Sequence, residues 1–483
     1  MRIRMQWAAA AIAAFAFGAN AQTARTGKDV LNNNETGWLS GVAGTTDATT
    51  GTFHAGGVAA CDGCHVMHNA SHGVARSTKV NPWNDAVPAF LLQGADQSST
   101  CLICHGDTTA GGTAKPFVIV NTGVATDYVN MNYSPGGDFG WLLRAGTTEP
   151  AGAMNRHGHN IVAADFTIPA DTLLTAPGGV LSFDATGQKV FSCSSCHDPH
   201  GRTRMQTTDS VTWTWAGPAG AGSDNAAITN PIYSSGSYGN LPLLGQAIGA
   251  YRLLGGKGYA PASNPTAPFT NNPPVAVAPA SYNHIEGGAK TNEVRVAYGA
   301  GMAEWCRNCH TNIHMDNYLS GALGGTGLKH PAGNNAALKP GQYNVYNSYI
   351  SSGSFQGTGD QYTSLVPFEN AKTFQVVGNT GSVSAITSLK AAVGAPATGT
   401  SILVASDKSN VTCLTCHRAH ASGFSSMIRW NNDDTFITNA SLTTFVDSQA
   451  RGNTALTAAY YGRSPADFGT FQRSLCNKCH GKD

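Results

Sequence analysis

The sequence has few charged side chains and almost no net charge. Asp, Glu, Lys and Arg together make up 12% of the 483 residues, against roughly a quarter in ordinary soluble proteins, and the formal net charge is +1. This balance lacks the basic excess of nucleic-acid-binding proteins, so no nucleic-acid partner is expected. It also lacks the high net charge that is typical of disordered chains.

Long hydrophobic runs are absent beyond the first twenty residues. The start of the chain combines Arg2 and Arg4, an apolar stretch over residues 7–18 and an A-x-A sequence at 19–21, which predicts a signal peptide over 1–21. The apolar stretch is too short to span a bilayer, and no cysteine follows it to carry a lipid anchor. We therefore expect a chain with no membrane span that is exported through the periplasm, with residues 22–53 as a polar N-terminal extension.

Clear periodicity is missing from long stretches rich in Gly, Thr and Asn, such as residues 217–237 and 378–409. Such stretches indicate loops. A compact domain rarely tolerates so much irregular chain unless something besides side chains supplies its core.

Cysteine is absent outside one motif, C-x-x-C-H, which occurs six times. This motif is the attachment signature of c-type haem. Two cysteines three residues apart lie on one face of a helical turn, so both can form thioethers with the haem vinyl groups while the next histidine binds the iron as proximal ligand. Motifs 1 to 6, in chain order, are Cys61–Cys64–His65, Cys101–Cys104–His105, Cys193–Cys196–His197, Cys306–Cys309–His310, Cys413–Cys416–His417 and Cys476–Cys479–His480.

Two other uses of paired cysteines fit the motifs less well. Twelve cysteines in an exported protein could form six disulfides, but disulfides do not require a histidine after every pair. Zinc sites use C-x-x-C twice for each metal, and they too do not require that histidine. Six covalently bound haems, with their iron, are therefore expected.

Six haems also account for the missing periodicity. Each haem is a large apolar plate around which a loop-rich chain can pack. We expect one haem-cored unit over residues 54–483, mostly irregular, with short α-helices and little β-structure.

Ten histidines outside the motifs are available as second, distal iron ligands. A histidine close behind its own motif cannot pass around the porphyrin, so it is expected to bind a different haem. We predict distal ligands at His68, His200, His314 and His420, which closely follow motifs, and at His159 and His330, with His54 in reserve. His72, His157 and His284 are expected to be surface or hydrogen-bonded residues.

Two histidines on one iron leave no open position for a substrate. No motif departs from C-x-x-C-H, and none suggests a haem with a free distal side. The pattern therefore favours an electron-transfer protein over an enzyme.

Longer strings carry a resemblance to a known family. They include HAGGVAACDGCHVMHN (54–69), LLQGADQSSTCLICH (91–105), VRVAYGAGMAEWCRNCHTNIH (294–314) and CLTCHRAHASGF (413–424). On these strings the chain resembles the OmcS-type hexahaem cytochromes, the extracellular cytochrome nanowire proteins of metal-reducing bacteria.

The resemblance implies bis-histidine haems in a fold of loops and short helices. It also implies head-to-tail polymerisation, in which one copy's histidine, here at the position of His68, binds a haem of its neighbour. Such a contact propagates as a filament when it does not close into a ring. The implied partners are further copies, other multihaem cytochromes, and extracellular minerals or electrodes. The segment 22–53 departs from the family, whose chain begins near the FHAGGV stretch.

Three functions are thus compared. The first is a filament that carries electrons outside the cell or on its outer surface. The second is a monomeric shuttle in the periplasm or on the outer surface, with His68 bound within its own chain. The third is a multihaem reductase with one five-coordinate iron.

Overall fold

A computed structural model provides the structure of the chain. It describes residues 64–65, 70–71, 74–75, 91–107, 118–120, 128, 131, 136–144, 157–170, 175–176, 182–183, 190–207, 212–216, 232–234, 247–277, 297–311, 330–333, 336–348, 368–370, 380–382, 407, 409–468, 473 and 475–480. The proposed signal peptide and the extension 22–53 lie outside these residues. Within them, no helix is long and apolar enough to cross a membrane.

The helices are short, and most of them belong to a haem motif or pack beside one. The α-helices are α4 (Gln97–His105), α5 (Met302–Cys306), α6 (Pro340–Ser348), α8 (Cys413–Cys416) and α9 (Asn453–Ala459). The 3₁₀ turns are η5 (Phe139–Leu142), η7 (Ala164–Phe166), η8 (Cys193–Ser195), η9 (Tyr251–Leu253), η10 (Ser425–Met427), η11 (Pro465–Asp467) and η12 (Leu475–Lys478).

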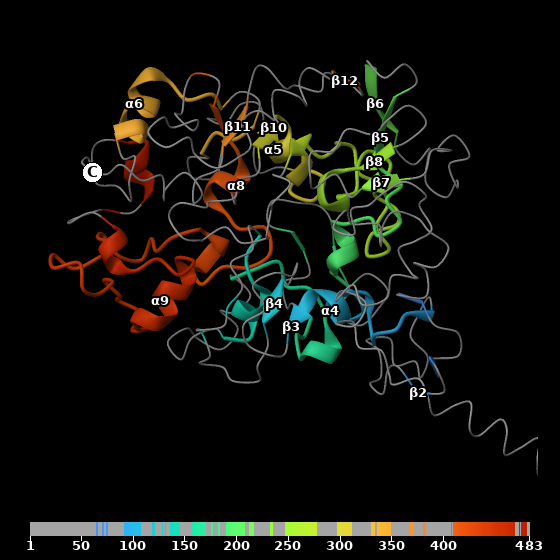
Figure 1. The fold of residues 1–483 in the computed structure, drawn as a ribbon, viewed down its shortest axis with the longest axis horizontal. Helices are drawn as coiled ribbons and strands as arrows, with labels where there is room; N and C mark the ends of the chain where they lie inside the picture. The colour runs from blue at the N-terminus through green and yellow to red at the C-terminus, as the bar shows by residue number, and fades with distance from the viewer. Residues whose placement is uncertain are drawn as a thin grey trace, which may run out of the picture.

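The strands are also short and form small, separate sheets (Figure 1). One sheet has the order β12-β6-β5-β8-β7 and another the order β13-β11-β10-β9, and two pairs are β1-β2 and β3-β4. The strands are β1 (Ala70–Ser71), β2 (Val74–Ala75), β3 (Gly106–Asp107), β4 (Ile119–Val120), β5 (Arg204–Thr207), β6 (Thr212–Ala216), β7 (Ile232–Ser234), β8 (Ala247–Gly249), β9 (Ala276–Val277), β10 (Ala297–Gly299), β11 (Phe368–Asn370), β12 (Thr380–Ser382) and β13 (Ser409–Val411).

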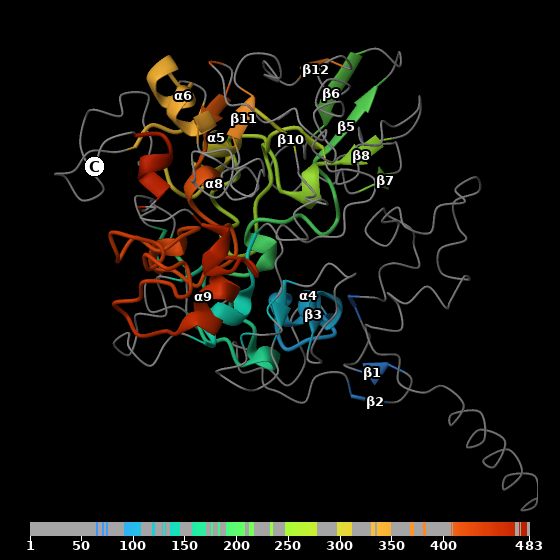
Figure 2. The same ribbon diagram turned by 60° about the vertical axis from the view of Figure 1, so that its left-hand side comes forward.

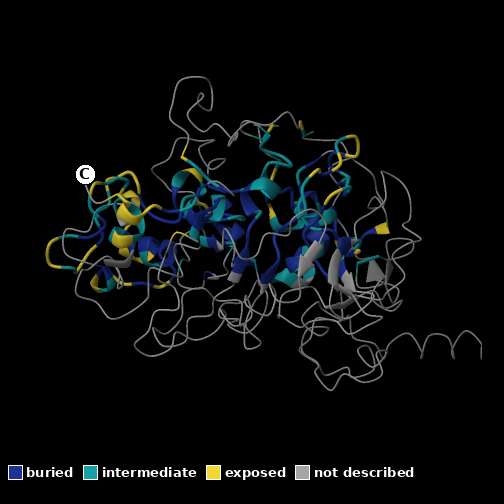
Figure 3. Ribbon diagram, turned by 90° about the horizontal axis from the view of Figure 1, so that it is seen from above, coloured by how far each residue is buried: buried dark blue, intermediate teal, exposed yellow. Residues whose placement is uncertain are grey.

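The largest apolar cluster joins distant parts of the chain. Leu102, Ile119 and Trp141 pack in one cluster with Phe424 and Tyr460, and the teal and red segments lie side by side in both ribbon views (Figures 1 and 2). Buried residues run as a band through the described part (Figure 3). The fold class expected from the sequence, mostly irregular chain with short helices and little β-structure, is confirmed.

Candidate haem-binding site

Motifs 2 to 6 form short helical turns, as the spacing predicts. In motifs 3 to 6 the histidine N–H donates to the carbonyl of the first cysteine at 2.9–3.0 Å, and motif 2 lies in α4. Local capping explains why the turns form there. The Asp96 carboxylate caps α4, while Ser192 and Thr412, each directly before a motif, form capping boxes with Ser195 and Thr415.

Successive motifs lie next to each other in chain order. The thiol of Cys101 hydrogen-bonds Cys193 and also interacts electrostatically with Cys64. Cys196 interacts with Cys309, and the thiol of Cys306 hydrogen-bonds Cys413. Cys416 then interacts with Cys476 and Cys479. The attachment points therefore follow one another from motif 1 to motif 6.

The ten described cysteines form no disulfide with one another. Among the described residues there is also no group of three His, Cys, Asp or Glu side chains arranged to hold a metal ion. For two of these thiols, burial is the main cause of a higher pKa, about 11 for Cys309 and about 12 for Cys416. The side chains of Cys309 and Cys416 are therefore neutral, partly buried thiols.

Four histidine pairs face each other, each joining a motif histidine to a predicted distal ligand. The ring centroids are 6.4 Å apart for His65–His200, 6.1 Å for His159–His310, 6.3 Å for His197–His420 and 6.2 Å for His330–His480. An imidazole nitrogen lies about 2 Å from a metal it binds and about 1.1 Å from its ring centre, so rings on opposite sides of one iron have centroids about 6 Å apart. The four pairs therefore fit haems held between them.

Two of these distal candidates are carried by one backbone ladder, which pairs residues 157–160 with 419–422. The His159 N–H donates to the carbonyl of His420 at 2.9 Å, and the His159 ring Nδ1 lies 2.6 Å from the carbonyl oxygen of Ala419. Gly158 bridges Ala421 in the same ladder. The ladder fixes His159 and His420, the candidates that face motifs 4 and 3, relative to each other.

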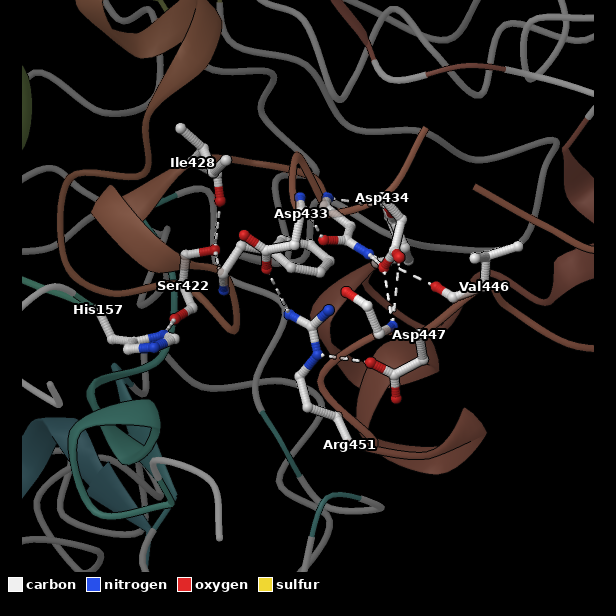
Figure 4. Close-up of polar contacts among 12 residues, drawn as sticks. His157, Ser422, Ile428, Asp433, Asp434, Val446, Asp447 and Arg451 are labelled. Atoms are coloured by element: carbon white, nitrogen blue, oxygen red, sulfur yellow. Dashed lines mark hydrogen bonds and ion pairs between the residues drawn. The ribbon is translucent and has the colours of Figure 1, made fainter. Parts of the chain in front are cut away.

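His157, expected to be an ordinary hydrogen-bonded residue, lies at the end of this ladder. Its ring Nδ1 lies 2.9 Å from the carbonyl oxygen of Ser422, and its own carbonyl accepts from the Ser422 N–H (Figure 4). The Ser422 hydroxyl donates in turn to the carbonyl of Ile428. The ring of His157 is therefore used in the ladder rather than in one of the four facing pairs.

Burial keeps the imidazoles of His159, His197 and His420 in the neutral form that binds a metal. It lowers the pKa of His159 to about 4, with His310 as a further cause, and that of His420 to about 3, with His197 as a further cause. Burial lowers the pKa of His197 as well. A neutral imidazole has a lone pair that can bind iron, so the rings of His159 and His420 can serve as ligands below neutral pH.

Comparison of the sequence with known proteins shows the family to which the chain belongs. The chain is 41% identical over 452 residues to the C-type cytochrome OmcS of Geobacter sulfurreducens, covering 89% of this chain and 94% of that protein. The chain belongs to the OmcS family of c-type cytochromes. No protein-family model matches it.

Two solved structures of OmcS share the fold. A cryo-EM structure of OmcS nanowires from Geobacter sulfurreducens matches with a TM-score of 0.69, at 39% identity over 89% of this chain and 100% of the other. A structure of the Outer Membrane Cytochrome S filament from the same organism matches with a TM-score of 0.66 and the same identity and coverage. The resemblance expected from the sequence strings is thus confirmed.

Some predicted site residues lie outside the described residues. These are Cys61, the distal candidates His68 and His314, the reserve His54, and also His72 and His284; of Cys104 only the backbone is described. Among the described residues, no histidine ring faces His417, whose side chain is exposed. This distinguishes motif 5 from motif 3, which otherwise resembles it.

Buried arginines flank motif 5. Arg418 is fully buried, with its guanidinium carbon 3.4 Å from the ring centroid of Tyr461. Arg429 is also buried, and its Nε donates to the carbonyl of Leu414 at 2.6 Å. The sequence analysis overlooked these two residues, because a single arginine in a sequence gives no sign of its burial.

Proposed function

We propose that the chain binds six haem c groups through its six motifs and conducts electrons as a head-to-tail filament outside the cell. The observation that carries the proposal is the set of four histidine pairs with centroids 6.1–6.4 Å apart. Bis-histidine iron has no open position and passes electrons without binding substrate. The function is therefore electron transfer rather than catalysis.

When bound, each haem supplies reversible one-electron chemistry at its iron. The chain's own residues hold the cysteine sulfurs, orient neutral imidazoles and bring successive motifs together in sequence order. Arg418 and Arg429 place buried positive charge beside motif 5, which favours the anionic propionates of a nearby haem.

The pairing follows a rule that points to the neighbouring copy. His420, behind motif 5, faces the histidine of motif 3, and His200, behind motif 3, faces that of motif 1. In both cases the trailing histidine serves the motif two places earlier. The same rule assigns His314, behind motif 4, to motif 2.

His68, behind motif 1, has no motif two places earlier in its own chain. In a row of copies with six motifs each, two places before motif 1 is motif 5 of the preceding copy. The exposed His417 of motif 5, which no described histidine faces, is therefore the proposed target of His68 from the next copy. This contact is heterologous and open, so it propagates.

The proposal completes six ligand pairs. His159 and His330 serve motifs 4 and 6, and His54 remains in reserve. The similarity to OmcS nanowires supports a filament of further copies as the main partner, with other multihaem cytochromes and extracellular minerals or electrodes as redox partners. Residues 1–21 are proposed as a signal peptide, which agrees with export through the periplasm to the outer surface or beyond. Residues 22–53 are proposed as a polar extension, and residues 54–483 as one haem-cored unit.

The experiment compares His68→Ala with His72→Ala, a matched change four residues away. His68→Ala is expected to keep six covalent haems but to abolish filaments in electron micrographs and to leave one haem per chain with an altered distal side. His72→Ala is expected to assemble like the unaltered protein. If the His68 variant polymerises normally, the head-to-tail contact is assigned to the wrong residue.

The alternative functions predict other outcomes. A monomeric shuttle gives discrete particles in the unaltered protein as well as in both variants. A reductase shows a high-spin ferric band and a spectral shift when cyanide or nitrite is added, whereas the conduit remains low-spin with little response.

A further inference from the structure

Motifs 1, 3 and 5 share a second structural element, which we call the strap. Each strap is a short segment that runs antiparallel to its motif: residues 91–93 for motif 1, 252–255 for motif 3 and 426–429 for motif 5. The motif histidine bridges one strap residue in each case, as His65 with Leu92, His197 with Leu254 and His417 with Ile428.

The hydrogen bonds of the three straps are also equivalent. The N–H of the residue after the bridge donates to the carbonyl of the second motif cysteine at 2.9 Å: Gln93 to Cys64, Gly255 to Cys196 and Arg429 to Cys416. In motifs 3 and 5 a return bond runs from Asp198 to Leu253 and from Arg418 to Met427. Identical register at three places far apart in the sequence indicates one repeated device.

The strap carries backbone strain. Leu91 has a φ of 56°; Arg252 and Leu253 have φ of 52° and 55°, and Ser426 and Met427 both have 59°. Two successive left-handed residues, closed by a bond from Leu254 N–H to the Tyr251 carbonyl, make a turn that normally uses Asn and Gly. Side chains such as leucine and methionine disfavour this conformation, so the surrounding contacts must maintain it.

The strained turn aims a carbonyl at the motif histidine. The ring Nδ1 of His197 lies 2.8 Å from the Arg252 oxygen, and that of His417 lies 2.8 Å from the Ser426 oxygen. At motif 1 the corresponding residue, Phe90, lies outside the described residues. With Nδ1 as donor, Nε2 is left to bind the iron, and the hydrogen bond makes the imidazole a stronger electron donor.

We propose that the straps of motifs 3 and 5 are positioning elements that fix the proximal ligands of haems 3 and 5 and lower the reduction potentials of these haems. A more strongly donating imidazole stabilises ferric over ferrous iron. The residues that act are Leu253 and Met427, whose left-handed conformation directs the preceding carbonyl. This inference rests on the proposed haem binding and adds to it a support that motifs 3 and 5 share.

The test uses Leu253, in the strap of motif 3. The two histidines proposed to bind haem 3, His197 and His420, belong to one chain and face each other. Leu253→Val places a β-branched residue where φ must be positive, whereas Leu253→Gly removes the side chain and permits that φ. In a redox titration of the haem-loaded protein, the Val variant is expected to move about one sixth of the amplitude to higher potential, since it changes one haem in six. The Gly variant is expected to titrate like the unaltered protein.

A second readout is the low-spin ferric EPR signal, which depends on the angle between the two imidazole planes, here 60° for His197 and His420. It should change in Leu253→Val and not in Leu253→Gly. Should the Val variant fail to fold, the same comparison is made with Met427→Pro and Met427→Gly. If the two variants at one position shift the reduction potential and the EPR signal equally, or neither variant shifts them, the strap does not position the proximal histidine. Haem content is measured separately, so that failure to load six haems counts against the proposed function and not against the strap.

Discussion

Motifs 3 and 5 share most features of their local design and differ in the histidine that faces them. Both begin with a capping box, both carry a strap, and both place the motif histidine Nδ1 2.8 Å from a strap carbonyl. His197 is partly buried and faces His420, whereas His417 is exposed and faces no histidine among the described residues. Among the described residues, the facing histidine is thus present for motif 3 and absent for motif 5.

His200 and His420 each face the histidine of the motif two places earlier. Under the proposed rule, this series leaves His68 and the iron position at motif 5 to be joined between chains. In the proposed filament, a repeat within one chain thus specifies the assembly of copies through the same kind of contact. Removing the histidine that faces motif 3 should have the largest effect, and changes to the packing around the motifs should have smaller ones.

The largest effect is expected from removing the ligand that closes motif 3. His420→Ala leaves the iron facing His197 without its second imidazole, while the proposed contact between copies is unchanged. We expect filaments to form, with one high-spin haem per chain that binds carbon monoxide. Visible and EPR spectra with carbon monoxide titration measure this, and a spectrum that stays fully low-spin would show that His420 is not the ligand.

A smaller but still large effect, on the free energy of unfolding, is expected from a substitution that disturbs the ladder that positions His420. Gly137 has a φ of 95°, and a Cβ added there would overlap the carbonyl oxygen of Ala421. Gly137→Ala should therefore lower the free energy of unfolding by about 2–4 kcal/mol, through strain and displaced backbone. Chemical denaturation monitored in the Soret band measures the change.

The control for this change is Gly341→Ala in α6, where an added Cβ meets nothing within 4 Å. It is expected to leave the protein at least as stable, because alanine favours helix over glycine. Equal losses in the two variants would mean that the ladder does not depend on the close approach at Gly137.

The smallest effect, counted per pH unit, is expected from a buried carboxyl near motifs 4 and 5. Glu369 on β11 accepts hydrogen bonds from the N–H groups of Gly301 and Met302, lies across from Asn410 on β13, and is faced by the carboxyl of Glu304 on α5. Burial, followed by the charge of Glu304, raises the pKa of Glu369 to about 8 from 4.5.

Because the folded state holds this proton more tightly than the unfolded state, stability is highest below pH 4.5 and falls as the pH rises towards 8. The slope is at most about 1.4 kcal/mol per pH unit from one group. Glu369→Gln keeps an acceptor for the two N–H groups and removes the titration, so its unfolding free energy should fall less over this range. Denaturation curves at pH 5, 6 and 7 measure the difference, and parallel curves for the two proteins would exclude the effect.

Much of the candidate site could be predicted from the sequence because C-x-x-C-H is a local pattern. The cysteine spacing indicated the helical turns, and the short spacing from His197 to His200 indicated that the second histidine serves another motif, which the pair with His65 fits. The signal for His159 rather than His157 was weaker, since both lie in one loop and only the ladder to residues 419–422 separates their roles.

The straps could not be predicted from the sequence. Their acceptors are backbone carbonyls, which every residue has, and the left-handed pairs Arg252–Leu253 and Ser426–Met427 use residues that normally avoid that conformation. The order of the motifs in space was likewise hidden, because it depends on contacts between cysteines up to about a hundred residues apart. Both features come from packing around the motifs rather than from local sequence.

The most direct test of the account is cryo-electron microscopy of the haem-loaded protein sheared from expressing cells. The account predicts continuous filaments in which the iron bound by His417 is also bound by His68 of the neighbouring copy. Discrete particles in which a histidine of the same chain binds that iron would contradict it.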